Sequence, residues 1–371
     1  MADLIRTNCI VIGGGVAGLS IAEKFSSVMN DVFLVEKDPF IGNGISSRNS
    51  EVIHAGVYYK PGSLKDRLLS EGKTKLYDYL SQRDISFQRV GKFIISSSPE
   101  ETDELIRITE NAAQCGLTDL FFDSENFKKR YPFIKSHEAL FSPSTGIFDS
   151  HSYMRSLQAD FENNGGFVLK NNVFRSAELH AGRIRVTVDD LNCQDSYVVE
   201  TPLIINCAGL DAVSIYNALP GDGPRFENRY VKGDYYSYSG KERLEHLIYP
   251  LPEKDGLGVH VTMDMSGQVR FGPSAYETNT INYEINTINE QLFLQSISKY
   301  WPSIDKSVIS PSYSGIRPKL VGIDDFVVKE KVVNDNLMVS ILGYESPGLT
   351  ASLGLAEYVH DICFKTYGFK N

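Results

Sequence analysis

The chain has 371 residues, of which 42% are hydrophobic and 23% charged, and its formal net charge is −10 at pH 7. This length suits two closely joined domains better than one simple core. The acidic balance argues against a nucleic-acid partner, because neutralising phosphates requires clustered Lys and Arg. A site for a small anion must therefore gather its positive side chains locally.

The five cysteines are scattered without CxxC spacing. They favour free thiols in a reducing compartment over a zinc site or a disulfide framework. No His, Cys and Asp cluster has metal-ligand spacing, so no metal is expected. No uninterrupted apolar run reaches the roughly 18–20 residues of a membrane-spanning helix, and the first strand begins too soon after Met1 for a signal or transit peptide. We expect a cytoplasmic protein, and a peripheral contact with the inner membrane stays open.

The N-terminal segment predicts a βαβ unit with a parallel strand pair. An apolar run at residues 9–12 leads into a glycine turn at 13–18, a helical segment at 19–27 and a second apolar run at 32–36. Apolar runs of this length, separated by a glycine turn and a helical period, are typical of such a unit.

The rest of the chain mixes helical and strand-rich segments. Helices are expected at 63–80, 99–115, 150–163 and about 349–358. Strands are expected at 91–96, 167–173, 203–206, 230–238 and 337–342, with hairpins at 183–199 and around a Ser266-Gly267 turn within 258–271.

Nucleotide-binding elements thus occur at the start, near 167–210 and at the end of the chain, with strand-rich material between them. We expect an α/β fold in which a Rossmann-type dinucleotide-binding domain is interleaved with a mixed β-sheet substrate (cap) domain. The binding domain is expected to comprise 1–84, 146–219 and 309–371, and the substrate domain 85–145 and 220–308.

Gly13, Gly15 and Gly18 fit the G-x-G-x-x-G dinucleotide fingerprint, with Val16 and Ala17 inside it. The glycines permit a tight turn, a close approach of a pyrophosphate and close helix–strand packing. Glu36, followed by Lys37, ends the second strand where a carboxylate can accept hydrogen bonds from a ribose, which disfavours NADP. The fingerprint alone does not separate FAD from NAD.

Later motifs separate the two cofactors, because the chain resembles the L-2-hydroxyglutarate dehydrogenases, which are flavoproteins of the D-amino-acid oxidase superfamily. The resemblance lies in the segments 46–59, 61–65, 246–250, 257–260, 270–273, 315–319, 325–327 and 345–353. It spans nearly the whole chain in order, and it implies FAD, which we expect to be bound without a covalent link. Attachment through His54 stays open as the alternative.

The resemblance also implies cofactor contacts beyond the fingerprint. The flavin ring is expected against the loop Ser47-Arg48-Asn49-Ser50 and against His54 and Ala55, the adenine against the backbone of Val173 after its strand, and the cofactor's underside against Ala208 and Gly209. Further contacts are expected at Gly315, Ser346, Pro347, Gly348, Leu349 and Thr350. The terminal helix is expected to aim its positive end at the flavin's pyrimidine end. The same segment is also typical of an ordinary helix start, with Ser346 as the N-cap and Pro347 at position N1.

Oxidising an alcohol by hydride transfer needs a base for the hydroxyl proton and a cation for the carboxylate. His260, expected in a strand over the substrate, is slightly favoured as the base, with His54 as a flavin or substrate contact; the roles can be exchanged. Arg317 is the expected carboxylate ligand, because a guanidinium offers a planar two-pronged grip.

Three tyrosines, Tyr58, Tyr59 and Tyr249, are candidate hydroxyl donors to substrate oxygens. A second, distal carboxylate has three candidate ligands, which the sequence does not separate: Lys232, Arg270 and Lys319.

The favoured function is oxidation of a small anionic 2-hydroxy acid, L-2-hydroxyglutarate to 2-oxoglutarate first, with electrons passed to a quinone, a carrier protein or oxygen. One alternative is an amino-acid or secondary-amine oxidase on the same fold. Another is a non-catalytic FAD-binding protein, against which the combination of His54, His260 and Arg317 argues.

Overall fold

The computed structural model describes residues 4–251, 258–286 and 290–369. Leu257 of one resemblance motif, and residues 1–3 and 370–371 at the two ends of the expected binding domain, lie outside the described residues. The centre of the fold is a six-stranded sheet whose strands are parallel except for the last pair. In sheet order these are β10 (Phe167–Lys170), β3 (Val32–Glu36), β2 (Cys9–Ile12), β14 (Leu203–Asn206), β22 (Asn336–Leu342) and β21 (Val327–Val333).

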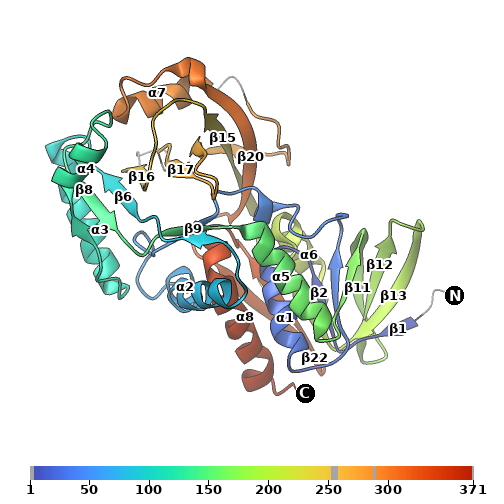
Figure 1. Ribbon diagram of the computed structural model, residues 1–371. Coiled ribbons are helices and arrows are strands. Elements are labelled where there is room, and N and C mark those ends of the chain that lie inside the picture. The colour runs from blue at the N-terminus through green and yellow to red at the C-terminus, as the bar shows by residue number, and fades with distance from the viewer. Residues whose placement is uncertain (1–3, 252–257, 287–289, 370–371) are drawn as a thin grey trace.

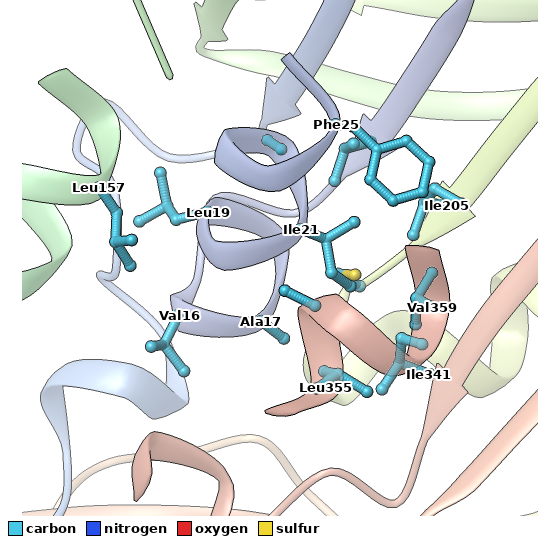
Figure 2. Close-up of a cluster of buried hydrophobic side chains, with 14 of the residues drawn as sticks. Val16, Ala17, Leu19, Ile21, Phe25, Leu157, Ile205, Ile341, Leu355 and Val359 are labelled. Carbon is cyan, nitrogen blue, oxygen red and sulfur yellow. The ribbon is translucent and has the colours of Figure 1, made fainter. Parts of the chain in front are cut away.

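Helices cover one face of this sheet. They are α1 (Val16–Ser26), α2 (Leu64–Gln82), α5 (Ser150–Asn163) and α8 (Gly348–Asp361), which ends in a π-helical turn, Ile362–Thr366. Alternate residues of β2 explain the layering: Cys9 and Val11 pack with the helices, and Ile10 and Ile12 with the opposite layer. Figure 2 shows apolar side chains of α1, α5, α8 and the central strands meeting in that core. Helix α1 begins at Val16, three residues before the predicted start.

A four-stranded sheet covers the other face of the central sheet. Its order is β1 (Leu4–Arg6), β13 (Asp195–Thr201), β12 (Arg183–Asp190) and β11 (Asn172–His180). The sequence predicted one strand over 167–173, and this was wrong. Asn171 adopts a positive φ of 57°, which breaks the strand into β10 and β11 of two different sheets.

A larger, nine-stranded sheet lies apart from these layers, with β6, β16 and β17 on the side of α1 and α5 away from β11–β13 (Figure 1). Its order is β19 (Tyr276–Thr278), β15 (Asn228–Tyr238), β18 (Val269–Phe271), β17 (Val261–Met263), β16 (Leu247–Pro250), β6 (Lys92–Ile95), β8 (Ala139–Ser142) and β7 (Phe121–Phe122), with β20 (Ile309–Leu320) paired to β15. The mixed sheet expected for a cap is thus present.

The strand β20 bears on the domain boundary. The sequence places residues 309–371 in the dinucleotide-binding domain, but β20 pairs with β15 along its whole length. We therefore propose that the binding domain resumes after Leu320.

The remaining elements link and cover these sheets. A three-stranded sheet consists of β4 (Val52–Ile53), β9 (Gly146–Phe148) and β5 (Phe87–Gln88). The other helices are α3 (Thr102–Gln114), α4 (Ser124–Arg130), α6 (Ala212–Ala218) and α7 (Glu290–Tyr300), with short 3₁₀ turns at Ile45–Ser47, Pro99–Glu101, Gly209–Asp211 and Lys306–Val308. None of the helices within the described ranges is long and apolar enough to cross a membrane.

Candidate active site

A cavity of about 1500 Å³ extends from the glycine turn of the central sheet to the large sheet. Gly13 and Gly15 line one end of it, and Tyr249 and His260 line the other. A single cavity thus joins the expected cofactor-binding segments to the expected substrate residues.

The glycine turn forms a cradle that a side chain would fill. Gly13 has a φ of +104°, and a Cβ there would lie 2.5 Å from the carbonyl oxygen of Cys207. A Cβ on Gly18 would lie 1.9 Å from the carbonyl oxygen of Gly13, so Gly18 packs beneath the turn and does not line the cavity. Gly15, Val16 and Ala17 line it, at the N-terminus of α1 where backbone N–H groups attract phosphate.

Glu36 fixes the neighbouring strand end. Its Oε2 accepts a hydrogen bond of 2.6 Å from Gly14 N, and its Oε1 accepts one of 2.8 Å from Asp38 N. Burial raises the pKa of Glu36, and these two backbone donors oppose that rise. Lys37 pairs with Asp211 at 2.6 Å across the cavity wall. A carboxylate anchored in this way keeps lone pairs for the ribose hydroxyls of a dinucleotide.

The far wall of the nucleotide end comes from β11 and the segment after β14. Val173 lines the cavity, although it is the second residue of β11 and does not follow its strand as predicted. Ala208 and Gly209, after β14, line the cavity as well.

The loop 46–50 forms the middle of the cavity, with one correction. Arg48, Asn49 and Ser50 line it, but Ser47 does not, because its hydroxyl turns back to donate to the carbonyl oxygens of Asn43 and Gly44. Ser46, which the sequence did not single out, takes its place: its Oγ accepts a 3.0 Å hydrogen bond from Val16 N at the start of α1.

Aromatic side chains hold this loop. The hydroxyl of Tyr313 donates to the Asn49 carbonyl at 2.6 Å, and the Arg48 guanidinium lies 4.0 Å from the centre of the Tyr283 ring. Gly315 lines the cavity beside them, and its lack of a side chain matters because a Cβ would lie 2.4 Å from the Arg48 carbonyl oxygen.

The terminal helix α8 begins at Gly348, one residue before the predicted start at about 349 and one residue after the start that Ser346 as N-cap would give. Pro347 occupies the N-cap position, and the Ser346 hydroxyl does not cap the helix but lies 3.2 Å from His54 Nε2. Ser346, Pro347, Gly348 and Leu349 line the cavity.

Two expected contacts, Thr350 and Ala55, lie behind the cavity surface. Thr350 is buried, and its hydroxyl bonds to the backbone on both sides of Ile53: it accepts from His54 N at 3.1 Å and donates to the Val52 carbonyl at 3.3 Å. The carbonyl of Ala55, also buried, accepts from Lys73 Nζ at 3.2 Å. Both therefore support the wall from behind and do not line it.

A cluster of charges, here called the Glu345 cluster, lies at the substrate end. The Glu345 carboxylate lies 2.9 Å from Lys65 Nζ, 3.1 Å from Lys319 Nζ and 3.9 Å from Arg317 Nε, and all four residues line the cavity. Burial alone would raise the pKa of Glu345, but the three cations outweigh it and the pKa is lowered. Three cations share one carboxylate, so the cluster carries a positive surplus toward the cavity.

The other two candidates for a distal carboxylate lie elsewhere. Lys232 Nζ donates to the Glu284 carbonyl, and Arg270 pairs with Asp264 at 2.7 Å. Neither side chain lines the cavity, which leaves Lys319 of the three. Sequence alone could not separate them, because Lys232 and Lys319 meet partners from other segments, Glu284 and Glu345, and the Arg270–Asp264 pair depends on the alignment of β17 with β18.

Both candidate histidines line the cavity together with Tyr58, Tyr59 and Tyr249. His260 directly precedes β17 rather than lying within a strand, and its ring stacks on that of Tyr249 with centroids 3.6 Å apart. Burial, and secondly the positive charge of Lys92, lower the pKa of His54 to about 3. Burial raises the pKa of Tyr58, Tyr59 and Tyr249, so their hydroxyls stay protonated.

Lys65, Glu345 and Lys92 are the residues near the substrate end that the sequence analysis missed. Lys65 and Glu345 stood within the motifs of the resemblance, at 61–65 and 345–353. Lys92 was the lone charge in the apolar run of β6, and such a residue is rarely buried without a reason.

Comparison with known proteins gives the class. A family model described as "FAD dependent oxidoreductase" (DAO) matches residues 8–362. The chain therefore belongs to this family of FAD-dependent oxidoreductases, and the open glycine cradle, the anchored Glu36 and the N-terminus of α8 fit that cofactor.

Individual relatives lie in the same family. The chain is 33% identical to the mitochondrial L-2-hydroxyglutarate dehydrogenase of Arabidopsis thaliana, over 95% of this chain and 83% of that protein. It is 28% identical to a glycerol 3-phosphate dehydrogenase of Caloramator mitchellensis, over 95% and 72%. Its fold superposes with a TM-score of 0.87, at 22% identity over 96% and 94%, on an L-α-glycerophosphate oxidase from Mycoplasma pneumoniae with FAD bound.

Proposed function

We propose that the protein oxidises a small 2-hydroxy acid, most specifically L-2-hydroxyglutarate to 2-oxoglutarate. The observation that carries this proposal is the Glu345 cluster, whose cations share one cavity with two histidines and three tyrosines. An alcohol that carries carboxylates needs both sets of groups at once.

When bound, FAD supplies the hydride acceptor. The protein's part is to hold the substrate and to remove its hydroxyl proton. Arg317 binds the carboxylate next to the reacting carbon through paired N–H donors. Tyr58, Tyr59 and Tyr249 stay protonated and donate to substrate oxygens.

His260 is the proposed base. An imidazole with a pKa of about 3 holds a proton too weakly to serve as an efficient base near neutral pH, and His54 is of this kind. His54 instead stays neutral and is held through Ser346, where it can hydrogen-bond the substrate or the cofactor.

The distal carboxylate of the substrate binds Lys319, and Lys65 lies next to it on the same Glu345 carboxylate. The cluster has three cations and one buried carboxylate, a surplus of two positive charges, which matches a substrate with two carboxylates. Asp324 also lies 3.7 Å from Lys319 Nζ, but its side chain is 91% exposed, so solvent screens its charge. A 2-hydroxy acid of equal length without the second carboxylate leaves one of these charges unmatched, and buried unmatched charge weakens binding.

Electrons then leave to a quinone, a carrier protein or oxygen, and we propose a cytoplasmic protein with non-covalent FAD that can also meet the inner membrane at its surface. Heat denaturation followed by centrifugation tests the FAD linkage: free flavin in the supernatant is expected. Flavin retained on the polypeptide would favour attachment through His54.

The central test is anaerobic addition of L-2-hydroxyglutarate to the yellow holoenzyme. We expect prompt bleaching with the L-isomer, none with the D-isomer, and a loss of roughly 100-fold or more in kcat/KM in Arg317→Ala, since two charge-assisted hydrogen bonds disappear. Lys319→Ala should lose on the order of tenfold with L-2-hydroxyglutarate and far less with L-2-hydroxypentanoate, which has one carboxylate. Lys232→Ala is the matched control and should keep both activities.

One second substrate has support from an observation. A phosphate dianion also suits three clustered cations, and one relative is a glycerol 3-phosphate dehydrogenase. Bleaching by glycerol 3-phosphate and not by L-2-hydroxyglutarate would select it. Bleaching by amino acids or secondary amines alone would select the oxidase alternative, and a yellow protein that no such compound bleaches would indicate a non-catalytic FAD-binding protein.

A further inference from the structure

A buried lysine lies directly behind the substrate end. Lys92 is 1% exposed and is the first residue of β6, followed by Phe93, Ile94 and Ile95. Strand β6 lies between β16 and β8 in the large sheet. In the part of the chain that the structure describes, no ion pair or hydrogen bond involves its ammonium group. Its contacts are aromatic: Nζ lies 5.1 Å from the centre of the Tyr58 ring and 4.7 Å from that of Tyr249.

Strand register places Lys92 in a row with the proposed base. Lys92 pairs with Leu247 of β16, so Tyr249, two residues on, points to the same face. Ile248 pairs with Val261 of the antiparallel β17, which brings Tyr249 opposite His260. Because β16 lies between β6 and β17, Tyr249 separates the two: its ring stacks on His260 at 3.6 Å and faces Lys92 at 4.7 Å.

Within the described ranges, the groups around Lys92 provide no countercharge. The segment after β4 contributes His54, Tyr58 and Tyr59, and β8 contributes Ser142 opposite Lys92. Helix α3 contributes Asn111, whose amide donates to the carbonyls of Val57 and Tyr59. Helix α2 contributes Lys73, which donates to the Ala55 carbonyl. None of these side chains is acidic. Burial accordingly lowers the pKa of Lys92 to about 7. A lysine kept in such surroundings costs stability, which points to a functional reason for its position.

We propose that Lys92 is a positioning residue of the oxidation: its charge, applied through the rings of Tyr249 and Tyr58, strengthens the hydrogen bonds that these hydroxyls donate to the substrate oxygen as that oxygen becomes negative. An ammonium against a phenol ring withdraws electron density and makes the hydroxyl a stronger donor. Inside a low-dielectric cavity, donors fixed before the reaction stabilise developing charge most effectively. This inference rests on the proposed function. The hydroxyl proton is still transferred to His260 and the hydride to FAD. Lys92 takes part in neither transfer.

The test compares Lys92→Met and Lys92→Arg with a matched control, Lys331→Met. Lys331 is also a buried lysine over a tyrosine ring, 4.6 Å from the centre of Tyr216, but it lies outside the cavity. In Lys92→Met we expect the rate constant of anaerobic flavin reduction at saturating L-2-hydroxyglutarate to fall by roughly tenfold or more, because donors to the developing charge are weakened. The dissociation constant of 2-oxoglutarate, read from the flavin spectrum, should change far less. Lys331→Met should keep the wild-type reduction rate.

Two readouts separate this role from a structural one. The Tm of the Lys92→Met holoenzyme should be unchanged or higher, because an unpaired buried charge is gone. Reduction in the wild type should fall as pH rises through about 7, where Lys92 loses its proton, and this fall should move to higher pH in Lys92→Arg and disappear in Lys92→Met. In a Tyr58→Phe, Tyr249→Phe background, Lys92→Met should add little, because both hydroxyls through which it acts are absent.

An activity-independent measurement keeps the inference distinct from the proposed function. The ¹³Cζ resonance of Tyr58, whose ring faces Lys92 and is not stacked on His260, is assigned with Tyr58→Phe in holoenzyme labelled at tyrosine. It should shift with a midpoint near pH 7 in the wild type and not in Lys92→Met. A wild type that no 2-hydroxy acid reduces would sink the proposed function, and this titration would still decide on Lys92. An unshifted resonance, or a Lys92→Met variant with wild-type reduction or a lowered Tm, overturns the inference.

Discussion

The two ends of the cavity are built in opposite ways. At the nucleotide end, one local segment, residues 13–36, supplies the glycine turn, the N-terminus of α1 and an anchored carboxylate, over a tightly packed apolar core. At the substrate end, side chains from distant segments meet, among them Lys65, His260 and Arg317. The first end recognises what all dinucleotides share, and the second distinguishes one small anion from another.

The difference also concerns stability. The glycine turn packs against one buried carboxylate, Glu36, whose oxygens accept two backbone hydrogen bonds, so cofactor binding and folding favour the same arrangement. The substrate end buries Glu345 with its cations, and Lys92 with no acidic partner among the described residues. Buried charges of this kind cost stability and are kept where function needs them.

The largest expected effect is the loss of FAD binding at the nucleotide end. Gly18→Val should abolish FAD binding, because even a Cβ at this position would lie 1.9 Å from the Gly13 carbonyl oxygen and must displace the turn. Flavin absorbance of the purified protein, before and after addition of FAD, measures this. Gly116→Asn is the control: Gly116 has a positive φ, which Asn tolerates, and open space around it. A yellow Gly18→Val protein would show that the turn yields more easily than its packing indicates.

The nucleotide end could be predicted because its signal is local. Glycine spacing, one helix and one strand-end acid follow each other in the chain, and each has a fixed geometric meaning. Even here the prediction named Ser47, whereas Ser46 lines the cavity, because the orientation of the 3₁₀ turn decides which serine faces it.

The substrate end was predictable only as a set of candidates. Resemblance supplied Arg317 and the two histidines, but not the pairing that excludes Arg270 and Lys232 or the convergence on Glu345. These facts depend on which strands become neighbours in a mixed sheet, and no sequence period encodes that order. Lys92 was visible as a lone charge in an apolar strand, yet its meaning required the register with β16.

The next largest effect separates the two histidines of the substrate end. His260→Asn should lower the rate of flavin reduction by roughly 10²- to 10⁴-fold, because the proposed base is lost. His54→Asn should cost on the order of tenfold, since the amide can still hydrogen-bond and no proton transfer is removed. Stopped-flow reduction with saturating L-2-hydroxyglutarate measures both. The reverse ranking would assign the base to His54.

The smallest effect concerns the stability of the Glu345 cluster. Glu345→Gln should lower the free energy of unfolding of the holoenzyme at pH 7 by about 3 kcal/mol, because it leaves Lys65 buried without its carboxylate. Glu357 is the control: it also pairs with two lysines, Lys24 and Lys75, but at the surface, where an exposed pair contributes up to about 1 kcal/mol. Urea unfolding of the variants measures the contrast.

The pH dependence of that contrast follows from the pKa of Glu345, which its cations hold below the ordinary value despite burial. A carboxyl with a lowered folded-state pKa stabilises fully above its unfolded value, roughly 4.3, and loses the contribution as pH falls through the folded value. The deficit of Glu345→Gln should therefore be largest near neutral pH and shrink on acidification below about pH 4. A deficit independent of pH would mean that Glu345 contributes through packing and not charge, and the positive surplus proposed to select a dicarboxylate would then need another source.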